Sequence, residues 1–126
     1  MPKTVPSTPS APASLAPYST ATEAGGLVFL SGQVALDPAT GERAPDDVET
    51  QARRVMENIG AILGDLGLAY DDIAKTTVFL ADIDDFATVN EVYKSYFGDA
   101  YPARSAVQAG ALPGGFLVEI EVVAAR

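Results

Sequence analysis

The sequence predicts a single α+β domain in which two helices pack on one face of a β-sheet and the elements follow the order β-β-α-β-α-β-β. Five segments have the β-branched or alternating residues typical of strands, and two segments repeat apolar residues at helical spacing. The 126 residues are the length of one domain with a core of its own. We expect the domain at residues 16–126. Residues 1–15, with four prolines and several serines, are expected to form a flexible tail.

A β-hairpin is expected at the start of the domain. Its two strands would span residues 18–23 and 27–33. The pair Gly25-Gly26 between them is typical of a tight hairpin turn, because glycine adopts positive φ angles without strain. Residues 37–41, Asp-Pro-Ala-Thr-Gly, have turn composition and lead from the second strand towards the first helix.

The first helix has the clearest pattern in the chain. It is expected to begin at Asp46, which would form a capping box with Glu49 three residues later. Gly67 would end it in the left-handed conformation that glycine favours after a helix. The apolar stripe that would face the sheet consists of Val48, Ala52, Val55, Ile59, Ile62, Leu63 and Leu66.

The second half of the chain predicts one strand, one helix and two further strands. The strand spans residues 73–80, where threonine, valine and phenylalanine are frequent. The helix runs from about residue 84 to 97 and ends at Gly98, and the last strands span 104–109 and 116–124. The inward stripe of this helix would consist of Phe86, Val89, Tyr93, Tyr96 and Phe97.

The alternation of the last strand assigns its residues to two faces. The face that packs under the helices would carry Phe116, Val118, Ile120 and Val122. The other face would carry Leu117, Glu119, Glu121 and Val123, with Lys75, Thr77 and Phe79 beside them on the middle strand. A face of mixed apolar and polar residues favours contact with another subunit over exposure to water.

Composition excludes several classes of function. The formal net charge is −9, and the eight cationic residues are scattered, so a dedicated nucleic-acid binder is not expected. The chain has no cysteine and no histidine, which excludes disulfides and the usual zinc and haem sites. No apolar run approaches the ~18 residues of a membrane helix, and the first residues do not have the pattern of a signal peptide. We therefore expect a cytoplasmic protein without a metal or membrane partner.

Charged residues on the last two strands are the first candidates for chemistry. Arg104 could hold a carboxylate through two parallel hydrogen bonds or form an inter-subunit salt bridge, and the residues alone favour the salt bridge. Glu119 could exchange protons if desolvation raised its pKa, or it could be a solvated strand residue or the partner of Arg104. Glu121 faces the same side, so spacing does not choose between the two glutamates. We expect the arginine and a glutamate to lie together.

Polar residues at three other places in the chain each allow two interpretations of their role. Asn90 lies four residues after Phe86, on or beside the apolar stripe, and would either cap a neighbouring carbonyl or line a pocket. Ser31 and Gly32 end a strand where glycine permits close approach to a ligand, although no histidine could activate the serine as a nucleophile. Lys75 could form a Schiff base, but a structural role on the strand is favoured.

Several motifs resemble the Rid family of reactive-intermediate deaminases, also called RidA or YjgF, and stand in the same order as in that family. They are Ser31-Gly-Gln33, Lys75-Thr-Thr-Val-Phe79, Phe86-Ala-Thr-Val-Asn-Glu-Val-Tyr93, Pro102-Ala-Arg-Ser105 and Val118-Glu-Ile-Glu121. The resemblance extends from about Ala16 to Ala124. It implies a mixed sheet of the chorismate mutase-like type and a homotrimer with active sites in the clefts between subunits.

The resemblance also implies an activity and roles for residues. The activity is hydrolysis of 2-imino acids such as 2-iminobutanoate and 2-iminopropanoate to 2-keto acids and ammonia, without a cofactor. Arg104 and the Gly32 amide would clamp the substrate carboxylate. Glu119 would orient water and exchange protons, helped by the backbone carbonyl of Ala106. The pocket would be completed by Tyr18, Ser31 and Asn90.

Four positions depart from the family pattern, and two other functions remain as alternatives. Ala16 replaces a usual glycine, Ala106 a cysteine found in well-known members, and Gly114 and Gly115 occupy a turn where lysine is common. One alternative is a non-catalytic trimer that binds small metabolites or acts as a chaperone. The other is an endoribonuclease, which the net charge of −9 disfavours. The side chain of the preferred imino acid and its source pathway do not follow from the sequence.

Overall fold

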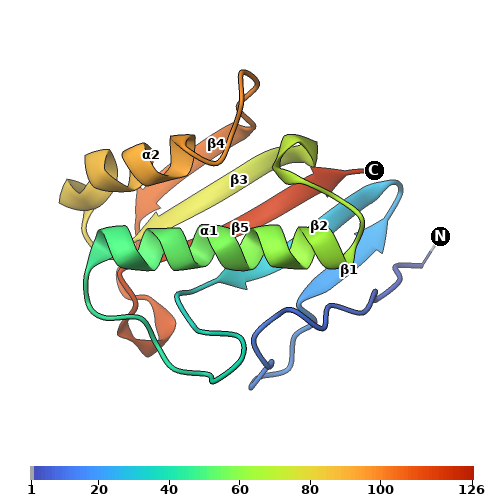
Figure 1. Cartoon of the computed structure of the whole chain (residues 1–126), viewed down its shortest axis with the longest axis horizontal. Helices are drawn as coiled ribbons and strands as arrows, with labels where there is room; N and C mark the ends of the chain where they lie inside the picture. The colour runs from blue at the N-terminus through green and yellow to red at the C-terminus, as the bar shows by residue number, and fades with distance from the viewer. Residues whose placement is uncertain (1) are drawn as a thin grey trace.

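The computed structural model describes residues 2–126 and has the predicted order of elements (Figure 1). The strands are β1 (Ala21–Ala24), β2 (Leu27–Gln33), β3 (Ile73–Leu80), β4 (Ala103–Gln108) and β5 (Val118–Ala125). The α-helices are α1 (Val48–Asp65) and α2 (Phe86–Lys94). Short 3₁₀ turns lie at Tyr70–Asp72, Ile83–Asp85 and Pro113–Gly115.

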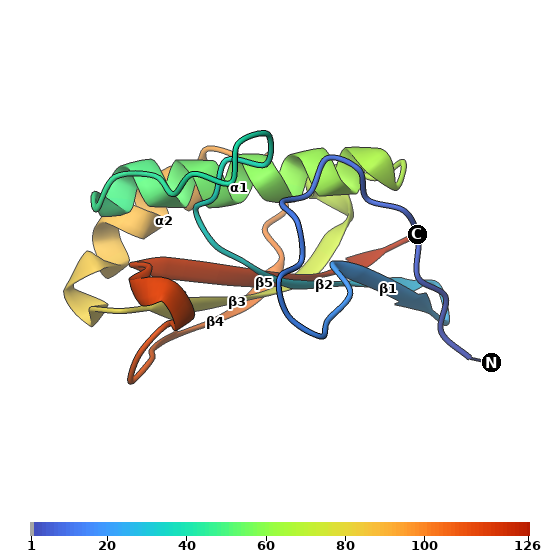
Figure 2. The same cartoon turned by 90° about the horizontal axis from the view of Figure 1, so that it is seen from below.

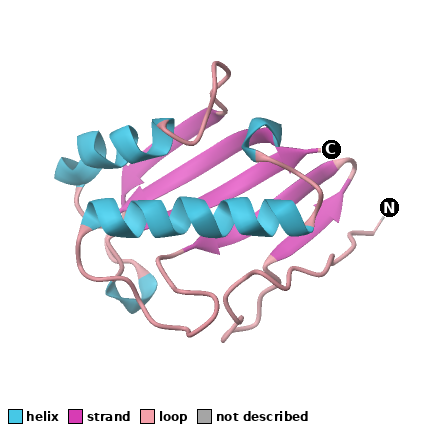
Figure 3. Ribbon diagram, in the orientation of Figure 1, coloured by secondary structure: helices cyan, strands magenta, loops and turns pink. Residues whose placement is uncertain are grey.

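The five strands form one mixed sheet in the order β1-β2-β5-β3-β4 (Figure 3). All neighbouring strands are antiparallel except β3 and β4, which are parallel because α2 carries the chain back between them. Both α-helices cover the same face, as Figure 2 shows edge-on, and within residues 2–126 neither α-helix lies on the other face. The predicted two-layer α+β architecture is therefore confirmed.

The core lies between α1 and the middle of the sheet. Val55, Ile59, Ile62 and Leu63 of the predicted α1 stripe are fully buried. Beneath them Val118, Ile120 and Val122 of β5 are buried in the predicted alternation. The residues between these, Glu119, Glu121 and Val123, occupy the opposite, helix-free face of the sheet. This alternation decides which side chains are available on each face.

Element ends differ from the prediction where local hydrogen bonds decide them. The capping box of Asp46 with Glu49 is wrong: Asp47 is the extended N-cap residue, and its carboxylate accepts hydrogen bonds from the amide and hydroxyl of Thr50. The second helix begins at Phe86 and not at residue 84, because Asp82 caps a separate 3₁₀ turn. It ends at Lys94, short of the predicted residue 97.

The N-terminal hairpin is confirmed, with a shorter first strand than predicted. Gly25 and Gly26 both have positive φ angles, 59° and 79°, as the tight turn requires. β1 begins at Ala21, because residues 18–20 form a loop that packs against the end of β2. Among the described residues, neither helix is long and apolar enough to span a membrane.

The N-terminal segment contacts the domain through hydrogen bonds that include those of Thr4 and Ser10. Thr4 forms an antiparallel bridge with Glu23 of β1 through two backbone hydrogen bonds of 2.9 Å. The amide and hydroxyl of Ser10 donate hydrogen bonds to the carboxylate of Asp65, at the end of α1, each 2.8 Å long. The flexibility expected for residues 1–15 stays a prediction.

Candidate active site

Arg104 lies on the edge strand β4, on the side of the sheet that faces α2. Its register partner on β3 is Thr76, whose side chain is buried beneath α2. The Arg104 guanidinium donates a hydrogen bond from Nη1 to Oδ1 of Asn90 on α2, at 2.7 Å. Asn90 is half-buried and accepts this hydrogen bond from a side chain, and does not cap a loop or a carbonyl. Asn90 thus lies beside Arg104, and its role in the pocket stays a prediction.

Two aromatic rings of α2 lie against the same guanidinium. The Cζ atom of Arg104 is 5.4 Å from the ring centroid of Phe86 and 5.0 Å from that of Tyr93. Both distances are within the range of cation–π attraction. Phe86, Asn90 and Tyr93 follow one another at helical spacings of four and three residues, so they share one face of α2.

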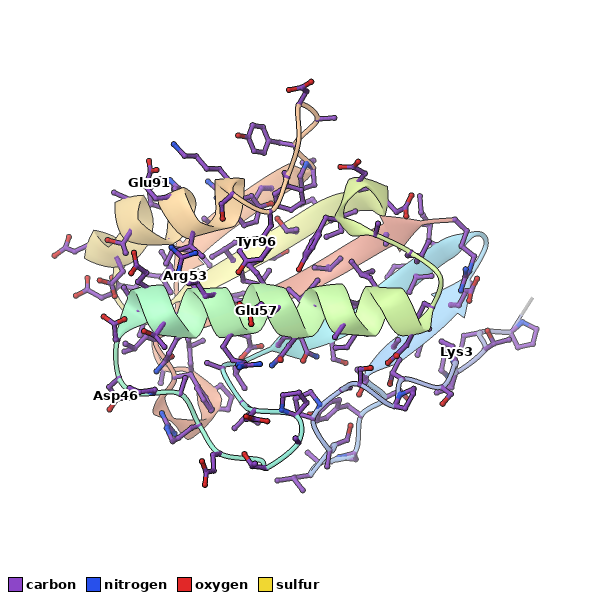
Figure 4. All side chains as sticks on the ribbon, in the orientation of Figure 1. Lys3, Asp46, Arg53, Glu57, Glu91 and Tyr96 are labelled. Atoms are coloured by element: carbon purple, nitrogen blue, oxygen red, sulfur yellow. The ribbon has the colours of Figure 1, made fainter. Side chains whose placement is uncertain are left out.

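A hollow of about 290 Å³ opens beside Arg104. It is lined by Asn90, Tyr93, Lys94, Tyr101, Pro102 and Arg104. The ammonium of Lys94 is engaged by Glu91, 2.9 Å away; Figure 4 labels Glu91 on α2. Within residues 2–126, none of the ion pairs involves Arg104, so its charge is available to an anionic ligand.

Glu119 lies on the opposite, helix-free face of the sheet. Its neighbours on that face include its register partner Phe79 and the exposed Glu121, two residues along β5. Desolvation raises the pKa of Glu119 above its ordinary value, and repulsion from Glu121 raises it further. A carboxyl group with a raised pKa is suited to proton exchange near neutrality. Glu119 is thus the less exposed of the two glutamates, and its choice over Glu121 as the catalytic acid stays a prediction.

Gly32 makes the position of Glu119 possible. A β-carbon at residue 32 would overlap the Oε2 atom of Glu119 and lie close to its Cδ and Cγ atoms. The backbone of Gly32 needs no positive φ angle, so the glycine is required for space and not for conformation. The Glu119 carboxyl group therefore lies directly on the Gly32 backbone.

Ser31 fixes the loop that carries Tyr18. Its hydroxyl donates a 2.6 Å hydrogen bond to the carbonyl of Ser19, and its amide donates to the carbonyl of Thr20 at 2.9 Å. Tyr18 is half exposed in an open hollow of about 730 Å³ that Ser31 and Glu121 also line. The hydroxyl of Ser31 is thus engaged by the backbone of the loop that carries Tyr18.

Ala106 lies on β4 with its backbone at the free edge of the sheet. The amide of Ala109 donates to the carbonyl of Leu80 on β3, so alternation turns the backbone groups of Val107 towards β3 and those of Ala106 away from it. Among the strands of the described residues, β4 is the last one at this edge of the sheet. The carbonyl of Ala106 is therefore placed to accept a hydrogen bond from a ligand or another subunit.

The expectation that Arg104 and Glu119 lie together is wrong within one chain. Arg104 is beside Thr76, which faces the helices, whereas Glu119 is beside Phe79, which faces away from them. The candidate residues form two groups, named here half-sites. The edge half-site contains Arg104, Asn90 and Ala106, and the face half-site contains Glu119, Gly32, Ser31 and Tyr18.

Sequence reasoning also missed residues that contact the arginine. The sequence places Phe86 and Tyr93 in the apolar stripe of the helix. In the structure Phe86 is 38% exposed, and the rings of both residues lie against Arg104. Tyr101 of the hollow was not considered as a ligand contact. The available signal was the spacing itself, since the predicted pocket residue Asn90 shares a helix face with both aromatic residues.

Known proteins are similar to this chain over nearly its whole length. The family model described as endoribonuclease L-PSP matches residues 8–126. The 2-iminobutanoate/2-iminopropanoate deaminase of Mus musculus is 47% identical over 120 residues, which cover 95% of this chain and 89% of that protein.

Solved structures agree in fold. A Rid-family protein from Yersinia pestis has a TM-score of 0.95 and 44% identity, covering 99% of this chain and 100% of its own. Escherichia coli TdcF, solved with bound serine, has a TM-score of 0.91 and 45% identity, covering 98% of each chain. The fold of this chain is thus the fold of these two proteins.

Proposed function

The chain belongs to the Rid family, whose family model carries the description endoribonuclease L-PSP, and we infer that it is a hydrolase that deaminates 2-imino acids. Its substrates are 2-iminobutanoate and 2-iminopropanoate, and its products are the 2-keto acids and ammonia. The observation that carries the inference is the position of Arg104, which forms no ion pair within residues 2–126. Asn90 and two aromatic rings hold its guanidinium at the wall of a hollow. Such a group is suited to a small carboxylate.

One active site is assembled from two subunits of a homotrimer. The two half-sites lie on opposite faces of one sheet, so a single chain cannot bring Arg104 and Glu119 to the same substrate. The helix-free face also exposes Leu27, Phe29 and Val107 at 39%, 41% and 46%, which favours its burial against another subunit. Light scattering that gave a monomer at micromolar concentration would contradict this assembly.

The two half-sites contribute different groups to hydrolysis. Arg104 of one subunit and the Gly32 amide of the next hold the substrate carboxylate, which fixes the imine carbon beside Glu119. The Glu119 carboxylate takes a proton from the attacking water as the new C–O bond forms. The π electrons of the C=N bond move to the nitrogen, which receives that proton from Glu119. After a second proton transfer from the new hydroxyl to the nitrogen, the C–N bond breaks and ammonia leaves. One water is consumed for each keto acid and ammonia formed.

The remaining site residues orient the reactants. The free carbonyl of Ala106 accepts a hydrogen bond from the substrate nitrogen or from water, while Tyr18 and Asn90 limit the pocket. No metal or organic cofactor is needed, because an imine carbon is already electrophilic. We also propose a cytoplasmic location, since a chain without cysteine requires no oxidising compartment.

A coupled trapping assay tests the activity. A threonine dehydratase generates 2-iminobutanoate, semicarbazide captures the imine that survives, and this protein is added in catalytic amounts. We expect the parent to lower the trapped product and the Arg104→Ala variant to leave it unchanged. Arg53→Ala, on the outer face of α1 (labelled in Figure 4), is the charge-matched control and should behave as the parent. Saturable binding of 2-ketobutanoate by a parent without turnover would support a non-catalytic binding role instead.

A further inference from the structure

A buried pair of hydroxyl groups lies directly beneath the edge half-site. The Oγ1 atom of Thr76 on β3 and the hydroxyl of Tyr93 on α2 are 2.7 Å apart. Thr76 is 1% exposed and Tyr93 is 5% exposed, and within residues 2–126 neither side chain has another hydrogen bond. Each hydroxyl therefore depends on the other, since an unpaired buried hydroxyl is costly.

The same two residues are the immediate neighbours of Arg104. Thr76 is its register partner on the adjacent parallel strand, and the Tyr93 ring lies 5.0 Å from its Cζ atom. The guanidinium is held from α2 by three side chains, Phe86, Asn90 and Tyr93, which we name the guanidinium cradle. The hydrogen bond between Thr76 and Tyr93 thus connects the guanidinium cradle on α2 to the sheet, beside the backbone of Arg104.

We propose that Thr76 is a positioning residue for substrate binding, because its hydrogen bond to Tyr93 holds the guanidinium cradle and so orients Arg104 before the substrate arrives. The inference rests on the proposed function, in which Arg104 binds the substrate carboxylate. An arginine side chain has many rotamers, and the cost of immobilising it would otherwise be paid at each binding event. The cradle fixes the guanidinium in advance and leaves N–H groups other than the one donated to Asn90 for the ligand.

Removing the threonine hydroxyl should disturb the cradle through Tyr93. In Thr76→Val the shape of the side chain is kept, but the Tyr93 hydroxyl loses the one hydrogen-bond partner that it has within residues 2–126. We expect it to turn towards water, which would move the ring away from Arg104. Tyr93→Phe keeps the ring and removes the hydroxyl from the other side of the same bond. Both variants should loosen the arginine without altering any group that contacts the reacting atoms.

Steady-state kinetics with 2-iminobutanoate separates positioning from stability. We expect Thr76→Val and Tyr93→Phe to raise KM by roughly three- to tenfold while kcat stays within about twofold, because the carboxylate is held equally in the ground state and the transition state. Thr76→Ser restores the hydroxyl and should restore KM. Tyr70→Phe is the matched control: it removes a tyrosine hydroxyl that donates to the Met56 carbonyl at 2.8 Å and not to Thr76 or the guanidinium cradle, and it should lower Tm without changing KM.

Nuclear magnetic resonance of the guanidinium provides a readout without catalysis. In the parent the ¹⁵N signals of Arg104, assigned by their absence in Arg104→Lys, should show restricted rotation, and in Thr76→Val they should show free rotation. If Arg104 is equally restrained in both proteins, or if KM of Thr76→Val equals that of Tyr70→Phe, Thr76 is only structural and the inference is wrong. A parent that hydrolyses no imine but releases Arg104 in Thr76→Val would refute the proposed function and leave the positioning role standing.

Discussion

The separation of Arg104 and Glu119 on opposite faces of the sheet leads to a strong prediction about mixed oligomers. Arg104→Ala abolishes the edge half-site, and Glu119→Gln abolishes the face half-site, so each variant alone should be inactive. General acid–base groups contribute about 10²- to 10⁴-fold, and we expect each variant to retain no more than about 1% of parent activity. Because the two defects lie on different halves, trimers that contain both variants should regain intact sites.

The size of the recovery follows from the assembly. A site is intact when the subunit that supplies Arg104 carries the Glu119→Gln change and the neighbour that supplies Glu119 carries the Arg104→Ala change. With equal, random mixing each condition holds for half of the subunits, so about one quarter of the sites in a closed ring are intact. The mixture should therefore have about 25% of parent activity, some 25-fold above either variant alone.

Co-expression of the two variants with different affinity tags gives the mixed trimers, and the trapping assay with 2-iminobutanoate measures their activity. The matched control is the parent co-expressed with the double variant that carries both changes. That mixture should have about one quarter of parent activity if sites are shared between subunits, and about one half if each subunit contains its own site. Absence of recovery in the first mixture, together with one half in the second, would refute the assignment of the half-sites to different subunits.

Three further predictions concern glycines and the pKa of Glu119. Gly32→Ala should lower kcat about tenfold or more with little loss of stability, because the new methyl group displaces the flexible Glu119 carboxylate; kinetics and Tm of one preparation test this. Glu119→Gln should raise the free energy of unfolding at pH 7 and have little effect near pH 4. The folded-state pKa is raised, so ionisation of Glu119 opposes folding only above the unfolded-state pKa. Gly60→Ala should destabilise the protein by about 1–3 kcal/mol in urea unfolding, because its methyl group would overlap the Tyr70 hydroxyl that donates to Met56.

Strand and helix positions were predictable because their patterns are long. The apolar stripe of α1 repeats over several turns, and the alternation of β5 repeats over several residues. The buried face of α1 and the buried face of β5 are both as predicted. The ends were less predictable because one hydrogen bond decides each of them. Asp46 and Asp47 are both acceptable N-caps in the sequence, and only the contact between Asp47 and Thr50 distinguishes them.

The positions of Arg104 and Glu119 on opposite faces of the sheet were not predictable from the residue types. Arg104 and Glu119 lie on neighbouring elements of the sequence, but β3 lies between β4 and β5 in the sheet. Whether two residues on such strands share a face depends on the register of both ladders, and a shift of one residue in either would reverse the answer. The registers Thr76–Arg104 and Phe79–Glu119 decide it here.

Gly32 links the ligand contact predicted for its backbone to the carboxyl group of Glu119, a contact that the sequence did not predict. Glycine at this position predicts that a ligand can approach the backbone. The structure shows the carboxyl group of Glu119 against that backbone. An amide donor and a carboxyl group of raised pKa are thereby held side by side on the face half-site. A substrate carboxylate on the Gly32 amide would sit beside an ionised Glu119 at a cost in repulsion, which the partner subunit's arginine would offset. In the proposed trimer the face half-site is therefore electrostatically incomplete by itself. Arg104 of the partner subunit, which forms no ion pair within residues 2–126, would supply the charge that it lacks.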